Sequence, residues 1–294
     1  MKGGLRWVVL ILTAVLCLSL GSRAWAQEWE EAFFKANQAY REGDFNGAIQ
    51  GYLRLIRTGH RGGQIHYNLG NAYFRAGRLG RAILEYERAH LLIPRDPDLN
   101  FNLAHARDQT RDAVEQSRGF VESAFFWVRS FSLNELFWAF AVLNILLWSV
   151  LAIRLFARPE WLYYMLLLVL SSWFVVGTSL GLKYYWITND DRAVILHEQV
   201  DVLAGPEEND TVLFRLHEGT VVHRDREEDG WCLIHLPDGK RGWTRSEAME
   251  LISGDGPLPP YGSSMLNRHL QFPAGYGPGV EKPFSPVDIE SGFC

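Results

Sequence analysis

The chain has few of the residues from which disulfide frameworks and metal sites are built. It holds three cysteines in 294 residues, and Cys17, Cys232 and Cys294 lie far apart. No Cys-x-x-Cys or His-Glu-x-x-His pattern occurs, so the usual ligand spacing of a zinc site is missing. We therefore expect no metal ion and no cofactor, and we interpret Cys232 as a free, packed thiol.

Catalytic groupings are scarce as well. Cys232 and His235 come nearest to a thiol nucleophile with a neighbouring base. They lie three residues apart in a run with strand character, and residues so spaced point to opposite faces of a sheet. The two side chains are not expected to meet, and we predict that the protein is not an enzyme.

The chain also lacks an excess of basic residues. Its formal net charge is −5. Domains that bind nucleic acid carry a basic patch or stripe, so we expect no nucleic-acid partner. The hydrophobic residues, in contrast, gather in three blocks, over residues 7–20, 136–153 and 161–182.

The first block has the composition of an export signal. Lys2 and Arg6 precede the apolar core, and Ala24-Trp25-Ala26 offers a small-x-small cleavage site. We predict a signal peptide over residues 1–26. If it is not cleaved, the block remains as a membrane anchor. In both cases the chain after residue 26 lies on the outer side of the membrane.

Residues 29–108 repeat with a period of 34 residues. Small residues, tyrosines and asparagines recur at fixed positions: Ala36 with Gly70 and Ala104, Gly43 with Gly77, Ala48 with Ala82, Tyr52 with Tyr86, and Asn68 with Asn102. This period predicts stacked helix-turn-helix units that share one concave face. Gly77 suits the left-handed conformation that ends the first helix of its unit, and Pro94 stops the second helix.

These residues resemble the tetratricopeptide repeat family, most clearly in the second unit. The first unit has Ala39 where the second has Tyr73, and the third supplies only its first helix. The resemblance implies about two and a half repeats whose first helices line a groove for protein partners. The groove residues it suggests are Asn37, Tyr40, Arg41, Asn71, Phe74, Arg75 and Asn102. Asparagine amides can bond a peptide backbone and arginines can bind a carboxylate; the alternative is that these side chains are solvated or serve packing.

Residues 110–131 mix charged residues with aromatic ones, which predicts a juxtamembrane helix with its aromatics at headgroup depth. Two transmembrane helices are predicted next, over residues 133–156 and 161–182, and each can cross roughly 30 Å of hydrocarbon. A buried helix of a soluble domain is the alternative for the first. A second apolar stretch directly after it argues against that alternative.

The short connector between the two spans predicts a hairpin with both soluble segments on one side. The export signal places that side in the periplasm, beyond a bacterial inner membrane. Arg154 and Arg158 in the connector agree with a cytoplasmic turn. Gly177 and Gly181 favour close helix packing, either within the hairpin or between two copies of the chain.

Residues 187–252 change to short β-rich runs separated by turns such as Asp229-Gly230 and Asp238-Gly239. With Gly219 and Gly242, they resemble the bacterial SH3-like domain, which implies an all-β barrel. Trp231 and Trp243 are candidates for a ligand face, and the alternative places both in the core. Residues 253–294 are rich in glycine and proline and are predicted to form a disordered tail.

The order of export signal, helical stack, membrane hairpin and SH3-like barrel over residues 1–252 resembles the BatE family of the Bacteroides aerotolerance operon group. The resemblance implies work beside von Willebrand factor A-type membrane proteins in envelope stress tolerance. We therefore expect a multi-domain membrane scaffold that presents protein-binding modules outside the cytoplasm. The alternative is a cell-envelope protein that binds peptidoglycan through its SH3-like domain.

Overall fold

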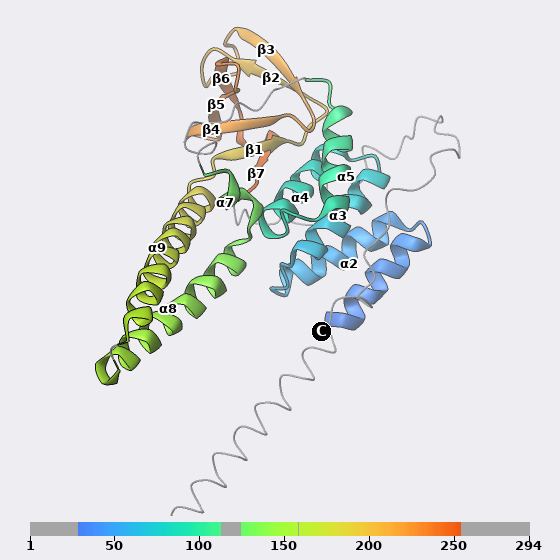
Figure 1. Cartoon of the computed structure of the whole chain (residues 1–294). Helices are drawn as coiled ribbons and strands as arrows, with labels where there is room; N and C mark the ends of the chain where they lie inside the picture. The colour runs from blue at the N-terminus through green and yellow to red at the C-terminus, as the bar shows by residue number, and fades with distance from the viewer. Residues whose placement is uncertain (1–28, 113–124, 158, 254–294) are drawn as a thin grey trace, which may run out of the picture.

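The computed structural model describes residues 29–112, 125–157 and 159–253. Along the chain it contains a stack of helices, a pair of long helices and an antiparallel sheet (Figure 1). The predicted signal peptide lies outside the described residues. So do the middle of the predicted juxtamembrane helix and nearly all of the predicted tail.

The helical stack is built from antiparallel helices joined by short turns. They are a first helix over residues 29–41, α2 (Phe45–Arg57), α3 (Gly63–Arg75), α4 (Leu79–Leu92) and α5 (Pro97–Asp108). Gly77 has a φ of +73°, and the N–H groups of Gly77 and Arg78 donate to the carbonyls of Phe74 and Tyr73. This pattern closes α3 with a left-handed glycine, as the repeat predicts.

The second repeat ends where its sequence indicates. α4 stops at Leu92, just before Pro94, which cannot continue the hydrogen-bond ladder of a helix. α5 then starts behind Asp96, whose carboxylate accepts from the N–H groups of Asp98 and Leu99. α5 is the first helix of the third unit.

Close approach of α3 and α4 explains the small residues of the repeat. A Cβ atom at Gly70 would lie 2.6 Å from the ring of Tyr86, which is fully buried. Tyr52 and Tyr67 are fully buried as well, so large rings fill the spaces that the small residues leave. The repeat is therefore a pattern of large and small residues packed against each other.

The two long helices form a hairpin. α8 (Leu133–Phe156) begins with a capping box between Ser132 and Glu135, and α9 (Glu160–Thr188) returns beside it. α9 continues past the predicted end of the second span at Leu182, because no helix-breaking residue follows before Asn189. A short helix, α7 (Phe126–Ser130), packs on α9, and Trp127 Nε1 donates to Ser179 Oγ at 3.1 Å.

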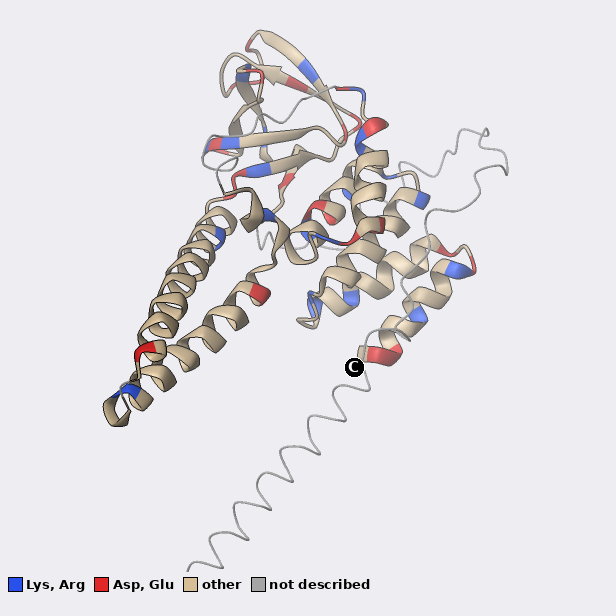
Figure 2. Cartoon of the chain, viewed as in Figure 1, with Lys and Arg blue, Asp and Glu red and all other residues tan. Residues whose placement is uncertain are grey.

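The hairpin exposes its apolar side chains. In the most apolar 18-residue stretch of each helix, only 11% of α8 and 6% of α9 is buried. Core helices of a soluble domain would be mostly buried. Charged residues occur only toward the ends of these helices (Figure 2). Both helices are long and apolar enough to span a membrane.

The C-terminal domain is a seven-stranded antiparallel sheet. Its strands run in the order β3-β2-β6-β5-β4-β1-β7. They are β1 (Arg192–Ile195), β2 (Gln199–Leu203), β3 (Val212–His217), β4 (Val221–Glu228), β5 (Trp231–His235), β6 (Arg241–Arg245) and β7 (Met249–Leu251), with a 3₁₀ turn, η1 (Ser246–Ala248), before β7. Alternate side chains form a separate core that includes Val202, Val222 and Ile234.

The predicted barrel is wrong in one respect, because the sheet does not close. The edge strands β3 and β7 are not paired with each other. β2 pairs with β6 at a single position, Leu203 with Trp243, beyond an irregularity between Val202 and Leu203. β7 is only three residues long, and Arg88 of α4 donates to the carbonyl oxygen of Leu251 in it.

That edge joins the sheet to the helical stack. Val194 and Ile252 belong to the hydrophobic core of the stack, although both lie in the C-terminal domain. Arg88 of α4 donates to the carbonyl oxygens of Leu251 and Ile252, at 2.9 and 3.3 Å. A helical side chain thus satisfies backbone acceptors that would otherwise be unpaired at the sheet edge. The two domains are packed together in one body, an arrangement that the sequence did not predict.

Candidate binding surfaces

The predicted groove residues separate into two groups in the structure. The amide side chains of Asn37, Asn71 and Asn102 are buried, whereas Arg41 and Arg75 are exposed and Phe74 is half-buried. Tyr40 is buried and packs edge-on against Phe45. Of the predicted groove residues, only Arg41, Phe74 and Arg75 lie where a partner can reach them.

The buried asparagines bind neighbouring helices. Asn71 Oδ1 accepts from the Tyr86 hydroxyl at 2.7 Å and from Asn102 Nδ2 at 3.0 Å. Asn37 repeats this arrangement with Tyr52 and Asn68, at 2.6 and 3.1 Å. A buried tyrosine hydroxyl needs an acceptor, and the asparagine supplies it. In this structure the amides of Asn37 and Asn71 bond residues of neighbouring helices, which fits the alternative that they serve packing between units.

The exposed arginines lie over aromatic rings. The guanidinium of Arg41 is 5.6 Å from the ring centre of Phe34, and that of Arg75 is 5.0 Å from Phe45. Stacking of this kind holds the positive charge of a guanidinium over the face of a ring. Both arginines lie at the C-terminal ends of first helices, at equivalent positions of successive repeats.

Aromatic side chains that the sequence reading missed lie next to these arginines. His105 of α5 lies 5.7 Å from Phe74 and 6.3 Å from Phe101, measured between ring centres, and it stacks on Phe101. Phe34 and Phe101 are 58% and 56% exposed, which is unusual for phenylalanine. Their spacing in the sequence could have indicated a shared helix face, because Phe34 and Arg41 are seven residues apart and Phe101 and His105 are four apart. We call Phe34, Arg41, Phe74, Arg75, Phe101 and His105 the groove patch.

The two tryptophans of the sheet do not form open platforms. Trp231 and Trp243 are 7% and 8% exposed and pack with Leu203 in a small cluster. Arg245 covers the ring of Trp231 at 4.1 Å, and Arg226 covers that of Trp243 at 5.3 Å. The structure thus gives the predicted ligand face a semi-core position, the alternative that the sequence left open.

A small cavity of about 290 Å³ opens beside Trp231. The carboxylates of Asp201, Glu208 and Glu247 line it together with Arg245, and Arg245 also pairs with Glu208. Asp201 pairs with Arg215 at 2.8 Å, so Glu247 is the lining carboxylate outside these two ion pairs, and it suits a cationic group such as an amine.

A buried ion network connects the two domains behind these surfaces. Arg88 Nη1 bonds Glu85 Oε1 at 2.9 Å, and its Nη2 bonds Glu250 Oε1 at 2.7 Å. Glu85 also contacts His66 Nδ1 at 2.6 Å. Burial raises the pKa of Glu85, but the hydrogen bonds and charges of His66 and Arg88 outweigh burial, so the pKa lies below its usual value. Glu85 is therefore held as a buried carboxylate.

The end of the stack is fixed to the sheet by a second carboxylate. Asp112 Oδ2 accepts from the Thr220 hydroxyl at 2.6 Å and from the backbone N–H of His217 at 2.7 Å. Burial raises the pKa of Asp112, but these donors outweigh it and lower the pKa overall. Contacts at both ends of the interface thus depend on ionised carboxylates.

The thiol of Cys232 and the imidazole of His235 lie in different surroundings. Cys232 is buried in the core of the sheet, and burial raises the pKa of its thiol to about 11. His235 bonds Asp225 at 2.7 Å and stacks on His223. Within residues 29–112, 125–157 and 159–253, no group of three or more His, Cys, Asp or Glu side chains is arranged to hold a metal ion.

Comparison with protein families agrees with both domains. Residues 63–96 match the tetratricopeptide repeat, and residues 197–250 match the bacterial SH3 domain. No curated protein matches the chain. Tetratricopeptide repeats bind proteins and bacterial SH3 domains often bind cell wall, so a repeat, an SH3 domain and two apolar helices fit a binding scaffold of the cell envelope.

Proposed function

We propose that the protein is a scaffold, anchored by α8 and α9 in the inner membrane, that binds another protein through the groove patch on the periplasmic side. The observation that carries the proposal is the pairing of exposed aromatic rings with two stacked guanidinium groups on the first-helix face of the stack. Such a surface suits a peptide segment with acidic and apolar side chains. The packed stack and sheet then form one periplasmic unit, because a hairpin keeps both on one side.

The resemblance to the BatE family extends this proposal to a class of partner. von Willebrand factor A-type membrane proteins are the partners it suggests, and envelope stress or aerotolerance is the process. The order of modules supports this extension, and the groove patch supplies a surface for it.

Site-specific photocrosslinking tests the groove. A benzoylphenylalanine in place of Phe74, in cells carrying the full chain, is expected to form an adduct with a defined partner protein. The same group at Gln50, which is exposed on the outer helix α2, is expected to form none. Changing Arg41 and Arg75 together to Glu should reduce the adduct about tenfold or more, since a hydrogen bond to a charged group contributes about 1.5–3 kcal/mol.

Arg54→Glu is the matched control, because Arg54 is exposed on α2 and away from the groove patch. It should leave the adduct unchanged. An adduct that survives the double change, or that Arg54→Glu reduces equally, contradicts recognition at the groove patch.

A second candidate function is binding of peptidoglycan through the sheet. The cavity beside Trp231 favours it, because the carboxylate of Glu247, which lies outside the Asp201–Arg215 and Glu208–Arg245 pairs, suits the amino group of a cell-wall peptide. Retention of the full chain on isolated sacculi, independent of Arg41 and Arg75, would distinguish this function from the scaffold.

A further inference from the structure

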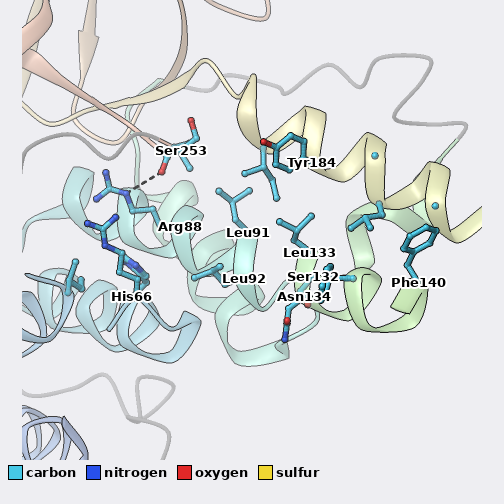
Figure 3. Close-up of a pocket in the computed structure, with 18 of the residues that line it drawn as sticks. His66, Arg88, Leu91, Leu92, Ser132, Leu133, Asn134, Phe140, Tyr184 and Ser253 are labelled. Atoms are coloured by element: carbon cyan, nitrogen blue, oxygen red, sulfur yellow. Dashed lines mark hydrogen bonds between the residues drawn. The ribbon is translucent and has the colours of Figure 1, made fainter. Parts of the chain in front are cut away.

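A large cavity lies where the stack, the hairpin and the sheet meet. Its volume is about 980 Å³, which is within the size range of protein sites for apolar ligands. Leu91 of α4, Leu133 of α8 and Tyr184 of α9 lie around the same space (Figure 3). The two helices of the hairpin diverge toward this end (Figure 1), and residues of both helices line the cavity.

The position of the cavity along the hairpin is set by helix geometry. Twenty helical residues rise about 30 Å, the thickness of the hydrocarbon core. Measured from Glu160 at the start of α9, that distance ends near Leu180; measured back from Phe156 on α8, it ends near Phe137. Phe140 and Gly177 therefore line the cavity at hydrocarbon depth, and the residues beyond Leu180 line it at headgroup depth.

Two glycines of α9 line this space in different ways. A Cβ atom at Gly177 would lie 3.0 Å from the ring of Phe140, so this position packs against α8 as predicted for the hairpin. A Cβ atom at Gly181 would meet nothing within 4 Å. Gly181 thus faces open space in the cavity lining and makes no close contact with α8.

The lining combines apolar and polar side chains. At hydrocarbon depth it consists of apolar side chains of α8 and α9. Beyond that depth it holds Ser132 and Asn134 at the start of α8, Arg61, His66 and Arg88 of the stack and Glu250 of the sheet, together with apolar residues such as Leu91 and Leu92. A lining that is apolar within the hydrocarbon and mixed at headgroup depth suits a molecule with an apolar chain and a polar head, oriented as in the outer leaflet.

We propose that the cavity holds one acyl chain of a membrane phospholipid. The chain enters from the bilayer between α8 and α9, and its headgroup lies at the polar end beside Ser132, Asn134 and Arg61. The inference rests on the proposed membrane placement of the hairpin. It gives the lipid a structural role at the junction of the three parts, because the chain fills space that they leave.

Reconstitution of the full chain into phosphatidylethanolamine nanodiscs tests the site. The discs contain a phosphatidylethanolamine with a diazirine on one acyl chain, and the adducts are mapped by mass spectrometry. Adducts are expected in the peptides around Leu133 to Phe140 and Gly177 to Tyr184. Gly181→Phe places a ring in the open space and should lower these adducts about tenfold or more, whereas Gly181→Ala should retain them.

Leu168→Phe is the control for added bulk, because Leu168 is 67% exposed on α9 and does not line the cavity. It should label like the wild-type protein. Equal cavity labelling in Gly181→Phe and Leu168→Phe overturns the proposal, and so does a wild-type protein without cavity adducts. Failure to enter nanodiscs contradicts the membrane placement instead, and the crosslink at position 74 tests the groove independently of both.

Discussion

Replacing Arg88 with Met is expected to destabilise the protein by about 3–5 kcal/mol, the cost of removing one partner from a buried ion network. Met fills most of the volume of the arginine stem, so the loss comes from charge and hydrogen bonding. Glu85 and Glu250 would remain buried without their cation, and the carbonyl groups of Leu251 and Ile252 would lose a donor. The contact between α4 and the sheet edge should open first.

Thermal unfolding of the full chain in detergent measures this effect. A loss of about 3–5 kcal/mol corresponds to a fall of roughly 10 °C in the midpoint for a domain unit of this size. Adding Glu250→Gln to Arg88→Met should recover part of the loss, because the uncompensated carboxylate is then gone.

Arg81→Met is the matched control on the same helix. Arg81 lies 3.9 Å from Glu250 and its side chain is 30% exposed, compared with 13% for Arg88. A partly exposed pair at this longer distance contributes about 0–1 kcal/mol. Equal destabilisation by the two substitutions would show that the buried network does not hold the domains together.

Gly80→Ala is expected to destabilise the protein, although alanine is the better helix former. A Cβ atom at this position would lie 2.6 Å from the carbonyl oxygen of Ile195 and 3.3 Å from Cα of Leu196. Both are backbone atoms of the sheet domain and cannot rotate away, so the sheet must shift from α4. Overpacking of this kind costs about 1–3 kcal/mol, whereas helix propensity alone predicts a gain of up to about 1 kcal/mol.

The sign of the change in the free energy of unfolding of Gly80→Ala therefore distinguishes a packed interface from independent domains. Gly181→Ala serves as the control, because it adds the same methyl group to α9 where nothing lies within 4 Å. It should leave the unfolding midpoint unchanged or raise it slightly, because the helix-propensity gain meets no clash there. Limited proteolysis should release the sheet from the stack faster in Gly80→Ala than in the wild-type protein. A stabilised Gly80→Ala protein would contradict the interface.

Local features of the fold were predictable from the sequence. Gly77, Pro94 and the length of the apolar stretches act through backbone geometry and hydropathy, which depend on a few neighbouring residues. The helix ends and the hairpin followed from them. The residues that are buried in the second repeat followed as well, because the repeat encodes which positions are small and which are large.

Long-range packing was not predictable in the same way. Gly80 and Arg88 look like ordinary helix residues, and their partners, Ile195 and Glu250, lie more than a hundred residues away in the chain. The open sheet likewise involves distant residues, because Arg88 of α4 bonds the edge strand β7 at Glu250 and Leu251. Within the candidate groove, a period of 34 residues places Asn71 and Arg75 at repeated positions. It does not distinguish an amide bonded to Tyr86 from an exposed guanidinium.

Accessibility of single cysteines tests the membrane arrangement most directly. In a chain whose native cysteines are replaced, we place one cysteine at Glu42 in the stack, at Lys240 in the sheet or at Ala157 in the connector, all exposed positions. A maleimide that cannot cross the membrane should label positions 42 and 240 in intact spheroplasts, and position 157 only after lysis. Labelling of position 157 before lysis, or protection of position 42 or 240, would contradict a periplasmic body held by a two-helix hairpin.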